Sequence, residues 1–336
     1  MAALLLAACG GGSAGSTPGG DPVANNGGTP ATASGTLLIV KGDNIFAMSG
    51  DGKSDTQLTH ETNSNFANNP VYSPDGSLIA YTHHVSPTGN QWGGAELHVM
   101  NADGSDDRTL IPSKAKGERA ETPTWTPDGK FVYYAHDVPI INGEQYTGDT
   151  LSIGKVDVAS GQAQEVVQDA IEPAISRSGS FLWVNYSVSD STFQMKIGDL
   201  DGSNGRTILT DKDFQAVWSP VLSSDGSKIA FGGSGRSNSK VGAVQAKLAQ
   251  ALNPLVPGKA EAHGLPWDPW VINADGSGLT KLANIGSDEM ALAWSPDNQE
   301  LAFSNLSSTY IMRADGGGLN RLLSRGDPGG LDWKAS

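Results

Sequence analysis

Histidine and glutamate side chains recur at matching places along this chain. His83 and His136 each stand five residues into a short apolar run, and Glu121, Glu172 and Glu289 each come shortly before a related apolar or aromatic position. Imidazole and carboxylate groups that converge on one point can hold a divalent metal or exchange protons with a substrate. His83, His136 and Glu121 are therefore candidate ligands of a metal-assisted lyase or hydrolase centre. The competing interpretation is that polar residues gather at any water-filled channel mouth.

The elements that would position these residues are marked by a repeated phrase. Each copy ends in a tight turn and is followed at once by a short apolar run, which predicts a strand, a turn and a second strand. Aspartate and glycine recur there because a tight hairpin turn requires positive φ, which glycine tolerates and aspartate partly tolerates. The copies are Tyr72-Ser-Pro-Asp-Gly76, Trp125-Thr-Pro-Asp-Gly129, Leu222-Ser-Ser-Asp-Gly226 and Trp294-Ser-Pro-Asp-Asn298.

A second phrase adds two more strands to each unit. Turns such as Asn101-Ala-Asp-Gly-Ser105 and Asn273-Ala-Asp-Gly-Ser277 separate a third predicted strand from a fourth. Four antiparallel strands that repeat every roughly 40–50 residues are typical of a β-propeller blade. We number the blades by the residue before the first turn, in the order Tyr72, Trp125, Ile175, Leu222, Trp294 and Trp333.

The two ends of the chain complete each other. Residues 37–58 contain three predicted strands without a first one, and residues 330–334 form a first strand without the rest. Joined, they predict a sixth blade in which N-terminal strands pair with the C-terminal strand and remove the exposed sheet edges. The predicted fold is therefore all-β, a six-bladed β-propeller over residues 36–336.

These phrases resemble the TolB-type propeller repeat, the WD40-like Pro-Asp repeat family. The resemblance rests on Trp-Ser-Pro-Asp followed by Ala-Phe or Ala-Tyr, and on Asn-Ala-Asp-Gly-Ser, and it covers nearly all of residues 36–336. It implies a periplasmic six-bladed propeller that binds other proteins. The same repeat also occurs in the propellers of oligopeptidases and in lyases of the oligogalacturonate type.

The two faces of the predicted propeller differ in their loops. First-to-second and third-to-fourth turns share one face, the turn face, and are short and uniform. Second-to-third loops and connections between blades share the opposite face, which we call the loop-rich face. Variable loops on a rigid scaffold usually carry binding, so we expect function there. The candidate contact residues are His83, His84, Trp92, Glu121, His136, Tyr146, Glu172, Tyr186, Trp267 and Glu289.

One second-to-third connection, at about residues 236–266 in blade 4, is much longer than the others. Apolar residues recur in it at helical spacing until Asn253-Pro254, which predicts a helical insertion. This helix would pack its apolar stripe on the propeller, form the lip of a groove beside Trp267, or do both.

The single cysteine of the chain follows Leu6-Ala7-Ala8. This pattern resembles the lipobox of a bacterial lipoprotein signal peptide, which implies removal of residues 1–8 and lipidation of Cys9. No lysine or arginine precedes Cys9. A signal that begins further upstream would explain this, and the competing interpretation is a disordered tail with a chance cysteine. Residues 9–35 are rich in small and polar residues and predict a flexible linker.

Charge and composition narrow the class of partner. The net charge of −14 disfavours nucleic acid, and no apolar run reaches the roughly 20 residues of a membrane-spanning helix. We expect a monomeric, non-catalytic binding or scaffolding module, held by its lipid in the bacterial cell envelope, in the periplasm or at the outer membrane. Its expected partner is an envelope protein, with a glycan as the alternative, and no cofactor is expected. The alternative function is a metal-assisted polysaccharide lyase or hydrolase.

Overall fold

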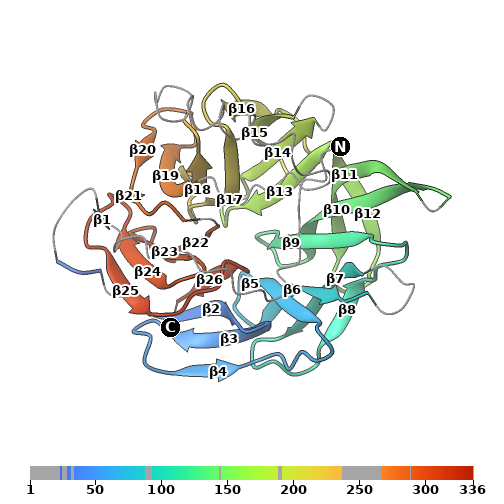
Figure 1. Ribbon diagram of the computed structural model, residues 1–336, viewed down its shortest axis with the longest axis horizontal. Coiled ribbons are helices and arrows are strands. Elements are labelled where there is room, and N and C mark those ends of the chain that lie inside the picture. Colours follow the sequence, from blue (N-terminus) through green and yellow to red (C-terminus); the bar gives the residue numbers. More distant parts are fainter. Residues whose placement is uncertain are drawn as a thin grey trace, which may run out of the picture.

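The computed structural model describes residues 23–24, 29–31, 34–87, 93–143, 145–187, 191–236, 266–287 and 289–335. Within these residues the chain is all-β, and its strands form six four-stranded blades around a central axis (Figure 1). The six-bladed propeller predicted from the repeats is confirmed. In the part of the chain so described, no helix is long and apolar enough to cross a membrane.

Blades 1 to 5 each take four antiparallel strands from one stretch of chain. Blade 1 contains β5 (Phe66–Tyr72), β6 (Leu78–Val85), β7 (Gly94–Asn101) and β8 (Arg108–Ile111). Blade 2 contains β9 (Arg119–Trp125), β10 (Phe131–Asn142), β11 (Gln145–Asp157) and β12 (Ala163–Gln168). Blade 3 contains β13 (Ala170–Ile175), β14 (Phe181–Ser187), β15 (Thr192–Gly198) and β16 (Arg206–Thr210).

The next two blades follow the same order. Blade 4 contains β17 (Ala216–Leu222), β18 (Lys228–Ser234), β19 (Trp267–Asn273) and β20 (Thr280–Lys281). Blade 5 contains β22 (Ala291–Trp294), β23 (Glu300–Ser304), β24 (Thr309–Arg313) and β25 (Asn320–Leu323). Blades 1 and 2 also touch through one parallel bridge between Ala95 and Arg119.

Blade 6 closes the ring with both ends of the chain. β2 (Thr36–Lys41) pairs with β26 (Leu331–Lys334), from Thr36 opposite Lys334 to Ile39 opposite Leu331. β3 (Asn44–Ser49) and β4 (Asp55–Gln57) complete the blade. The predicted closure is therefore confirmed.

The chain is docked on the propeller before β2 begins. The Ala31 N–H donates to the Gly318 carbonyl at 2.8 Å, and the Trp333 indole N–H donates to the Ser34 carbonyl at 2.6 Å. Further upstream, β1 (Val23–Ala24) pairs with β21 (Ala283–Asn284). Ala31 and Ser34 of the predicted linker, residues 9–35, therefore contact the propeller. Carbonyl groups of this segment accept hydrogen bonds from the Arg313, Asn320 and Trp333 side chains, so a contact of this kind needs no large apolar side chain in the segment.

The repeated phrase has a local physical cause. In four blades a serine or threonine hydroxyl donates to the aspartate two residues later at 2.6 Å, and Gly76 and Gly129 adopt φ of 72° and 68°. These hydrogen bonds lock the turn that joins the first strand to the second. The pairs are Ser73–Asp75, Thr126–Asp128, Ser223–Asp225 and Ser295–Asp297.

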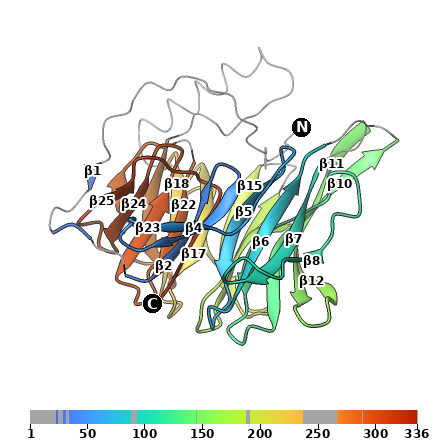
Figure 2. The same ribbon diagram turned by 90° about the horizontal axis from the view of Figure 1, so that it is seen from below.

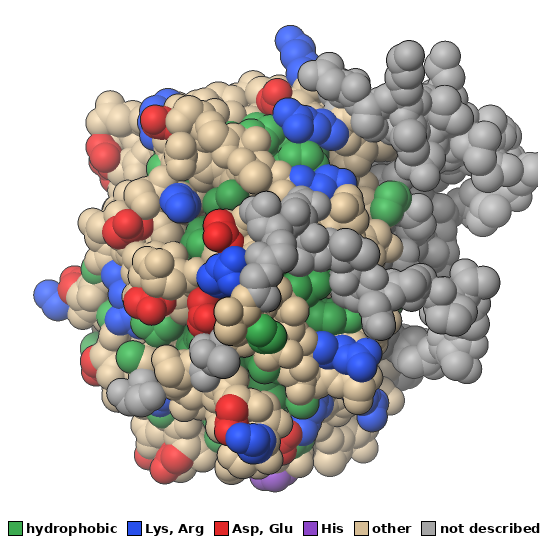
Figure 3. All heavy atoms as spheres, turned by 90° about the vertical axis from the view of Figure 1, so that its left-hand side faces the viewer, with side chains coloured by type: hydrophobic (Ala, Val, Ile, Leu, Met, Phe, Trp, Pro, Cys, Tyr) green, Lys and Arg blue, Asp and Glu red, His purple; other side chains and the backbone are tan. Residues whose placement is uncertain are grey.

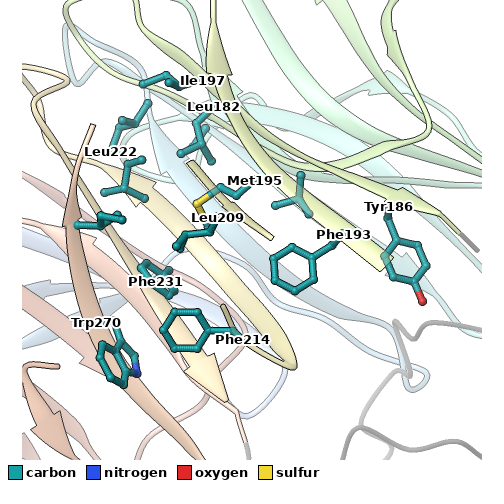
Figure 4. Close-up of a cluster of buried hydrophobic side chains, with 14 residues drawn as sticks. Leu182, Tyr186, Phe193, Met195, Ile197, Leu209, Phe214, Leu222, Phe231 and Trp270 are labelled. Carbon is teal, nitrogen blue, oxygen red and sulfur yellow. The ribbon is translucent and has the colours of Figure 1, made fainter. Parts of the chain in front are cut away.

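The core lies between neighbouring blades, where side chains from facing sheets interlock. One cluster joins blades 3 and 4 and includes Phe193, Met195, Phe214, Phe231 and Trp270 (Figure 4). Phe214 makes edge contacts with Phe231 at 5.3 Å and with Trp270 at 5.1 Å between ring centroids. Such packing fixes the angle between blades and therefore the shape of the central channel.

The innermost strands carry an irregularity that repeats. Asn69, Thr122, Glu172 and Ser219 each precede a proline and have φ between 47° and 54°. The strand register shifts beside each of them, which identifies β-bulges. Residues before proline avoid this backbone region, so the packing around the channel must hold them there. Beside one bulge, the Asn69 N–H donates to the Gly329 carbonyl, in the connection that leads into β26.

Candidate functional site

A cavity of about 380 Å³ follows the central channel and is lined by the innermost strands of all six blades. Its lining residues that carry a carboxyl, imidazole or guanidinium group are mainly acidic. They are Asp43, His84, Glu172, Arg177, Glu289, Asp327 and Asp332. A cavity with this lining would favour a positively charged occupant over a negative one.

The acidic residues gather toward the loop-rich end of the channel. Asp43 lies in the turn between β2 and β3, Asp327 lies in the connection from β25 to β26, and Glu289 precedes β22. All three positions are second-to-third loops or connections between blades. Burial raises the pKa of Asp327 above its ordinary value, which reflects how closely protein surrounds this mouth.

Glu172 lines the same cavity from the bulge in β13, where its φ is 54°. Desolvation raises the pKa of its carboxyl group to about 7. The site therefore gains negative charge as the pH rises through neutrality. Sequence analysis identified Glu172 as a candidate, and the structure places it in the channel.

The turn-face end of the channel has a different character. The Arg177 guanidinium reaches across it and donates to the Pro74 carbonyl at 2.9 Å, from blade 3 to blade 1. Nearby, the Ser224 N–H donates to the Asn298 side chain at 2.7 Å. These links tie separate blades together at the turn face and leave the acidic residues at the opposite mouth.

His84 and Glu121 meet in a buried group between blades 1 and 2. The His84 Nε2 and Glu121 Oε1 atoms are 3.5 Å apart, and the His84 ring stacks on Phe66 at 4.0 Å. Burial raises the pKa of Glu121 to about 7 and, together with the Arg119 charge, lowers the pKa of His84 to about 3. A neutral imidazole therefore faces a carboxyl group that changes charge near neutral pH.

His83 and His136 occupy equivalent positions, as the sequence predicts, but each has its own partner. His83 Nε2 lies 3.1 Å from Glu61, and His136 Nε2 lies 2.9 Å from Glu118. The hydrogen bond to Glu61 raises the pKa of His83. His83, His136 and Glu121 thus belong to three separate groups, and the described residues show no metal-binding group that combines them. Among the described residues, the centre of His83, His136 and Glu121 that the lyase or hydrolase alternative requires is not assembled.

The remaining candidates fall into three classes. Tyr186 and Trp267 are 9% and 4% exposed and pack in apolar clusters, although the Tyr186 hydroxyl points away from its cluster (Figure 4). Tyr146 donates a hydrogen bond to Asp149 in the hairpin between β10 and β11. Trp92, Cys9 and the predicted helical insertion lie outside the described residues.

Two apolar residues of the loop-rich face are not among the contact residues that the sequence predicts. Ile140 and Leu306 are the exposed large hydrophobic residues of the described chain, at 49% and 54%. Ile140 lies in the β10–β11 hairpin, which projects beyond the rest of blade 2 (Figure 2), and Leu306 lies in the β23–β24 loop and lines the cavity. Both are second-to-third connections. No periodic pattern in the sequence identifies Ile140 or Leu306, because the exposure of a loop side chain depends on where that loop lies in the folded propeller.

One side of the outer surface contrasts with the channel. On the side seen in Figure 3, acidic and basic side chains are interspersed over the surface. Interspersed charges of opposite sign largely cancel in the electrostatic potential. The carboxyl groups at the channel mouth do not cancel in this way, because they have the same sign. The loop-rich mouth therefore combines acidic groups with an exposed apolar residue.

Comparison with known proteins supports the fold alone. No protein-family model and no curated protein matches the sequence. TolB from Acinetobacter baumannii is similar in structure, with a TM-score of 0.65, 16% identity, and coverage of 92% of this chain and 68% of that one. A protein from Agrobacterium tumefaciens described as a TolB has a TM-score of 0.58, 14% identity, and coverage of 89% and 93%. A chain of a nidogen/laminin complex has a TM-score of 0.60, 9% identity, and coverage of 88% and 97%. The protein therefore has the β-propeller fold found in TolB-like structures.

Proposed function

We propose that this propeller is a non-catalytic protein-binding module that engages its partner through the loop-rich face. The observation that carries the proposal is the location of Ile140 and Leu306. Exposed large apolar side chains at described positions both lie on this face, and one of them lines the channel mouth. Apolar anchors beside polar groups are typical of protein interfaces.

The charge of the mouth suggests the chemistry of the partner. Asp43, Glu172, Glu289 and Asp327 line the cavity at or near this end. A segment of a partner that carries lysine or arginine next to an apolar residue would complement both features. One similar structure is a chain of a nidogen/laminin complex, an assembly of proteins, which supports a protein as the partner class.

The N-terminal pattern supports a proposal for where the protein acts. The Leu6-Ala7-Ala8-Cys9 sequence supports a lipid on Cys9 and a location in the bacterial cell envelope. Resemblance of the repeats to TolB-type propellers supports the same compartment. A linker between the lipid and the ring would let the loop-rich face reach partners near the membrane.

Paired surface variants test this proposal. Leu306→Asp and Ile140→Asp place a charge in the proposed interface, and Lys130→Glu changes a charge on the turn face, where the Lys130 side chain is 72% exposed. We expect capture of an envelope protein from solubilised envelopes to fall at least tenfold with the first two variants and to persist with the third. Loss of capture with Lys130→Glu alone would place the interface on the opposite face.

A further inference from the structure

A group of metal-ligating side chains lies in blade 1, separate from the residues that line the channel. His83 is on β6, and Glu96 and His98 are on the neighbouring β7. One ligand atom from each of the three lies within 4.8 Å of the other two. The two imidazole rings are 4.9 Å apart between centroids, and the Glu96 carboxylate lies near both.

The His83 ring is oriented to offer one nitrogen. Its Nε2 faces the Glu61 carboxylate at 3.1 Å, which favours a proton on that nitrogen. Its Nδ1 is buried, has no hydrogen-bond partner among the described residues, and lies 3.9 Å from Glu96 Oε2. A buried nitrogen lone pair without a hydrogen-bond donor lowers the stability of the fold unless another group binds to that nitrogen.

The His98 ring repeats this arrangement with its nitrogens exchanged. His98 is 8% exposed, and its Nδ1 lies 3.2 Å from the Asp107 carboxylate. A proton on Nδ1 leaves Nε2 as the acceptor, and Nε2 faces the Thr109 hydroxyl at 3.0 Å and Glu96 Oε2 at 3.4 Å. Metal-binding histidines typically donate their other ring N–H to a carboxylate in this way.

The spacing suits a tetrahedral ion. Ligand atoms about 2.1 Å from a tetrahedral zinc ion stand about 3.4 Å apart. The Glu96–His98 distance is already 3.4 Å, and the Glu96–His83 distance is 3.9 Å. The ligand atoms of the two histidines lie within 4.8 Å of each other, so side-chain movement must bring His83 closer to the other two ligands. We propose that His83 Nδ1, Glu96 Oε2 and His98 Nε2 form a binding site for a divalent transition metal of the zinc class, with Glu61 and Asp107 as positioning residues.

Three protein ligands leave one position of a tetrahedral ion open. Water or a donor atom of a bound molecule would fill it. His83 stands near the end of β6 and Glu96 near the start of β7, so the site is close to the second-to-third connection of blade 1. The site is thus on the side of the loop-rich face, but the metal proposal does not depend on partner binding.

Blade 2 provides an internal control. His136 pairs with a loop glutamate as His83 does, but Ser152 and Gly154 stand opposite His136 and Tyr134, where Glu96 and His98 stand opposite His83 and Tyr81. The Tyr134 ring lies so close to Gly154 that a Cβ there would be 2.6 Å from it. Blade 2 therefore keeps a histidine beside two carboxylates, since Glu165 Oε1 lies 3.9 Å from His136 Nδ1, but Gly154 replaces the second histidine.

Calorimetric titration of the full chain with zinc chloride, after chelator treatment, tests the site. We expect wild-type protein to bind zinc at this site with a dissociation constant of micromolar or below. Glu96→Gln and His98→Asn should each weaken that binding at least tenfold, and Glu61→Gln should weaken it about tenfold through the His83 ring. His136→Asn should leave it unchanged. Because Glu96 is partly exposed, Glu96→Gln tests the site even where His98→Asn impairs folding.

Cobalt provides an independent measurement. Bound Co²⁺ in a four-coordinate site with two imidazoles and a carboxylate absorbs visible light far more strongly than the six-coordinate aqueous ion, and Glu96→Gln should remove this added absorption. Three results would overturn the proposal. They are absence of zinc binding by the wild-type chain, unchanged binding in both Glu96→Gln and His98→Asn, and equal loss of binding in His136→Asn.

Discussion

The backbone N–H of Tyr72 donates a hydrogen bond to the Asp332 carboxylate at 2.7 Å, between residues 260 positions apart. The Ile175 N–H donates in the same way to the Thr124 hydroxyl at 3.1 Å. In both cases the donor follows a bulge in the innermost strand, and the acceptor belongs to the preceding blade. Innermost strands therefore offer N–H groups that neighbouring blades bind, and one such link joins blade 6 to blade 1.

Removal of the Asp332 acceptor should weaken this closure. Asp332→Ala leaves the Tyr72 N–H without its partner, which should lower the free energy of unfolding by about 1–3 kcal/mol. Asp332→Asn keeps an oxygen acceptor and removes a carboxyl group whose pKa is raised by burial. This variant should therefore lose less unfolding free energy than Asp332→Ala. Denaturant unfolding of the three proteins measures this, and equal stability of wild type and Asp332→Ala would contradict the role of the link.

The repeated turns should show coupling between their two side chains. The Ser73 hydroxyl donates to Asp75 at 2.6 Å and lowers the pKa of Asp75 to about 2. Ser73→Ala and Asp75→Ala should each cost about 1 kcal/mol, and the double variant should cost less than their sum. Asp75 should contribute fully to the free energy of unfolding at pH values above the pKa that it has in the unfolded chain. This contribution should disappear as the pH falls from about 4 through about 2. Additive losses in a double-mutant cycle would show that the two side chains act separately.

Glu121 should make stability depend on pH in the opposite direction. Its pKa is raised by burial from 4.5 to about 7, so the folded state holds a proton that the unfolded state releases between these values. The protonated Glu121 costs the folded state nothing below about pH 4.5. As the pH rises through 7, the free energy of unfolding falls by an amount on the order of 3 kcal/mol. In Glu121→Gln the free energy of unfolding should fall less between pH 4.5 and pH 8, and this variant should be more stable than wild type at pH 8. Glu165→Gln, at a half-exposed position, is the control, and an unchanged decline in Glu121→Gln would contradict the assignment.

The acidic channel should bind a basic peptide in a pH-dependent way. Because the pKa of Glu172 is about 7, affinity for an oligolysine peptide should rise between pH 6 and pH 8 and fall with added salt. Glu172→Gln should weaken binding at pH 8 and reduce its pH dependence, as measured by fluorescence anisotropy. Arg177→Gln, at the turn-face end, should not reduce affinity. A wild-type affinity that is independent of both salt and pH would show that the channel charge plays no part.

The fold was predictable because its signals are local. A hydroxyl, an aspartate and a glycine within five residues mark three of the turns, and Asn298 replaces the glycine in a fourth, so Ser73, Asp75 and Gly76 can be identified without knowledge of distant parts. The closure was predictable because the two chain ends each lack what the other supplies. The bulges were not, since Thr122 and Glu172 adopt a backbone conformation that residues before proline disfavour.

The candidate sites were only partly predictable, because their partners are distant in sequence. Equivalent positions for His83 and His136 follow from the repeat, but Glu61 and Glu118 as their partners do not. His98 joins His83 only through the pairing of β6 with β7. Leu306 was missed because a single apolar residue in a loop carries no periodic signal.

Site-specific cross-linking tests the central claim most directly. A photoreactive residue at position 306 or 140 lies on the loop-rich face, and one at position 130 lies on the turn face. In intact cell envelopes we expect the first two positions to form the same covalent adduct with one envelope protein, and position 130 to form none. An adduct that forms at position 130 and is absent at positions 306 and 140 would contradict the assignment of the loop-rich face as the binding surface.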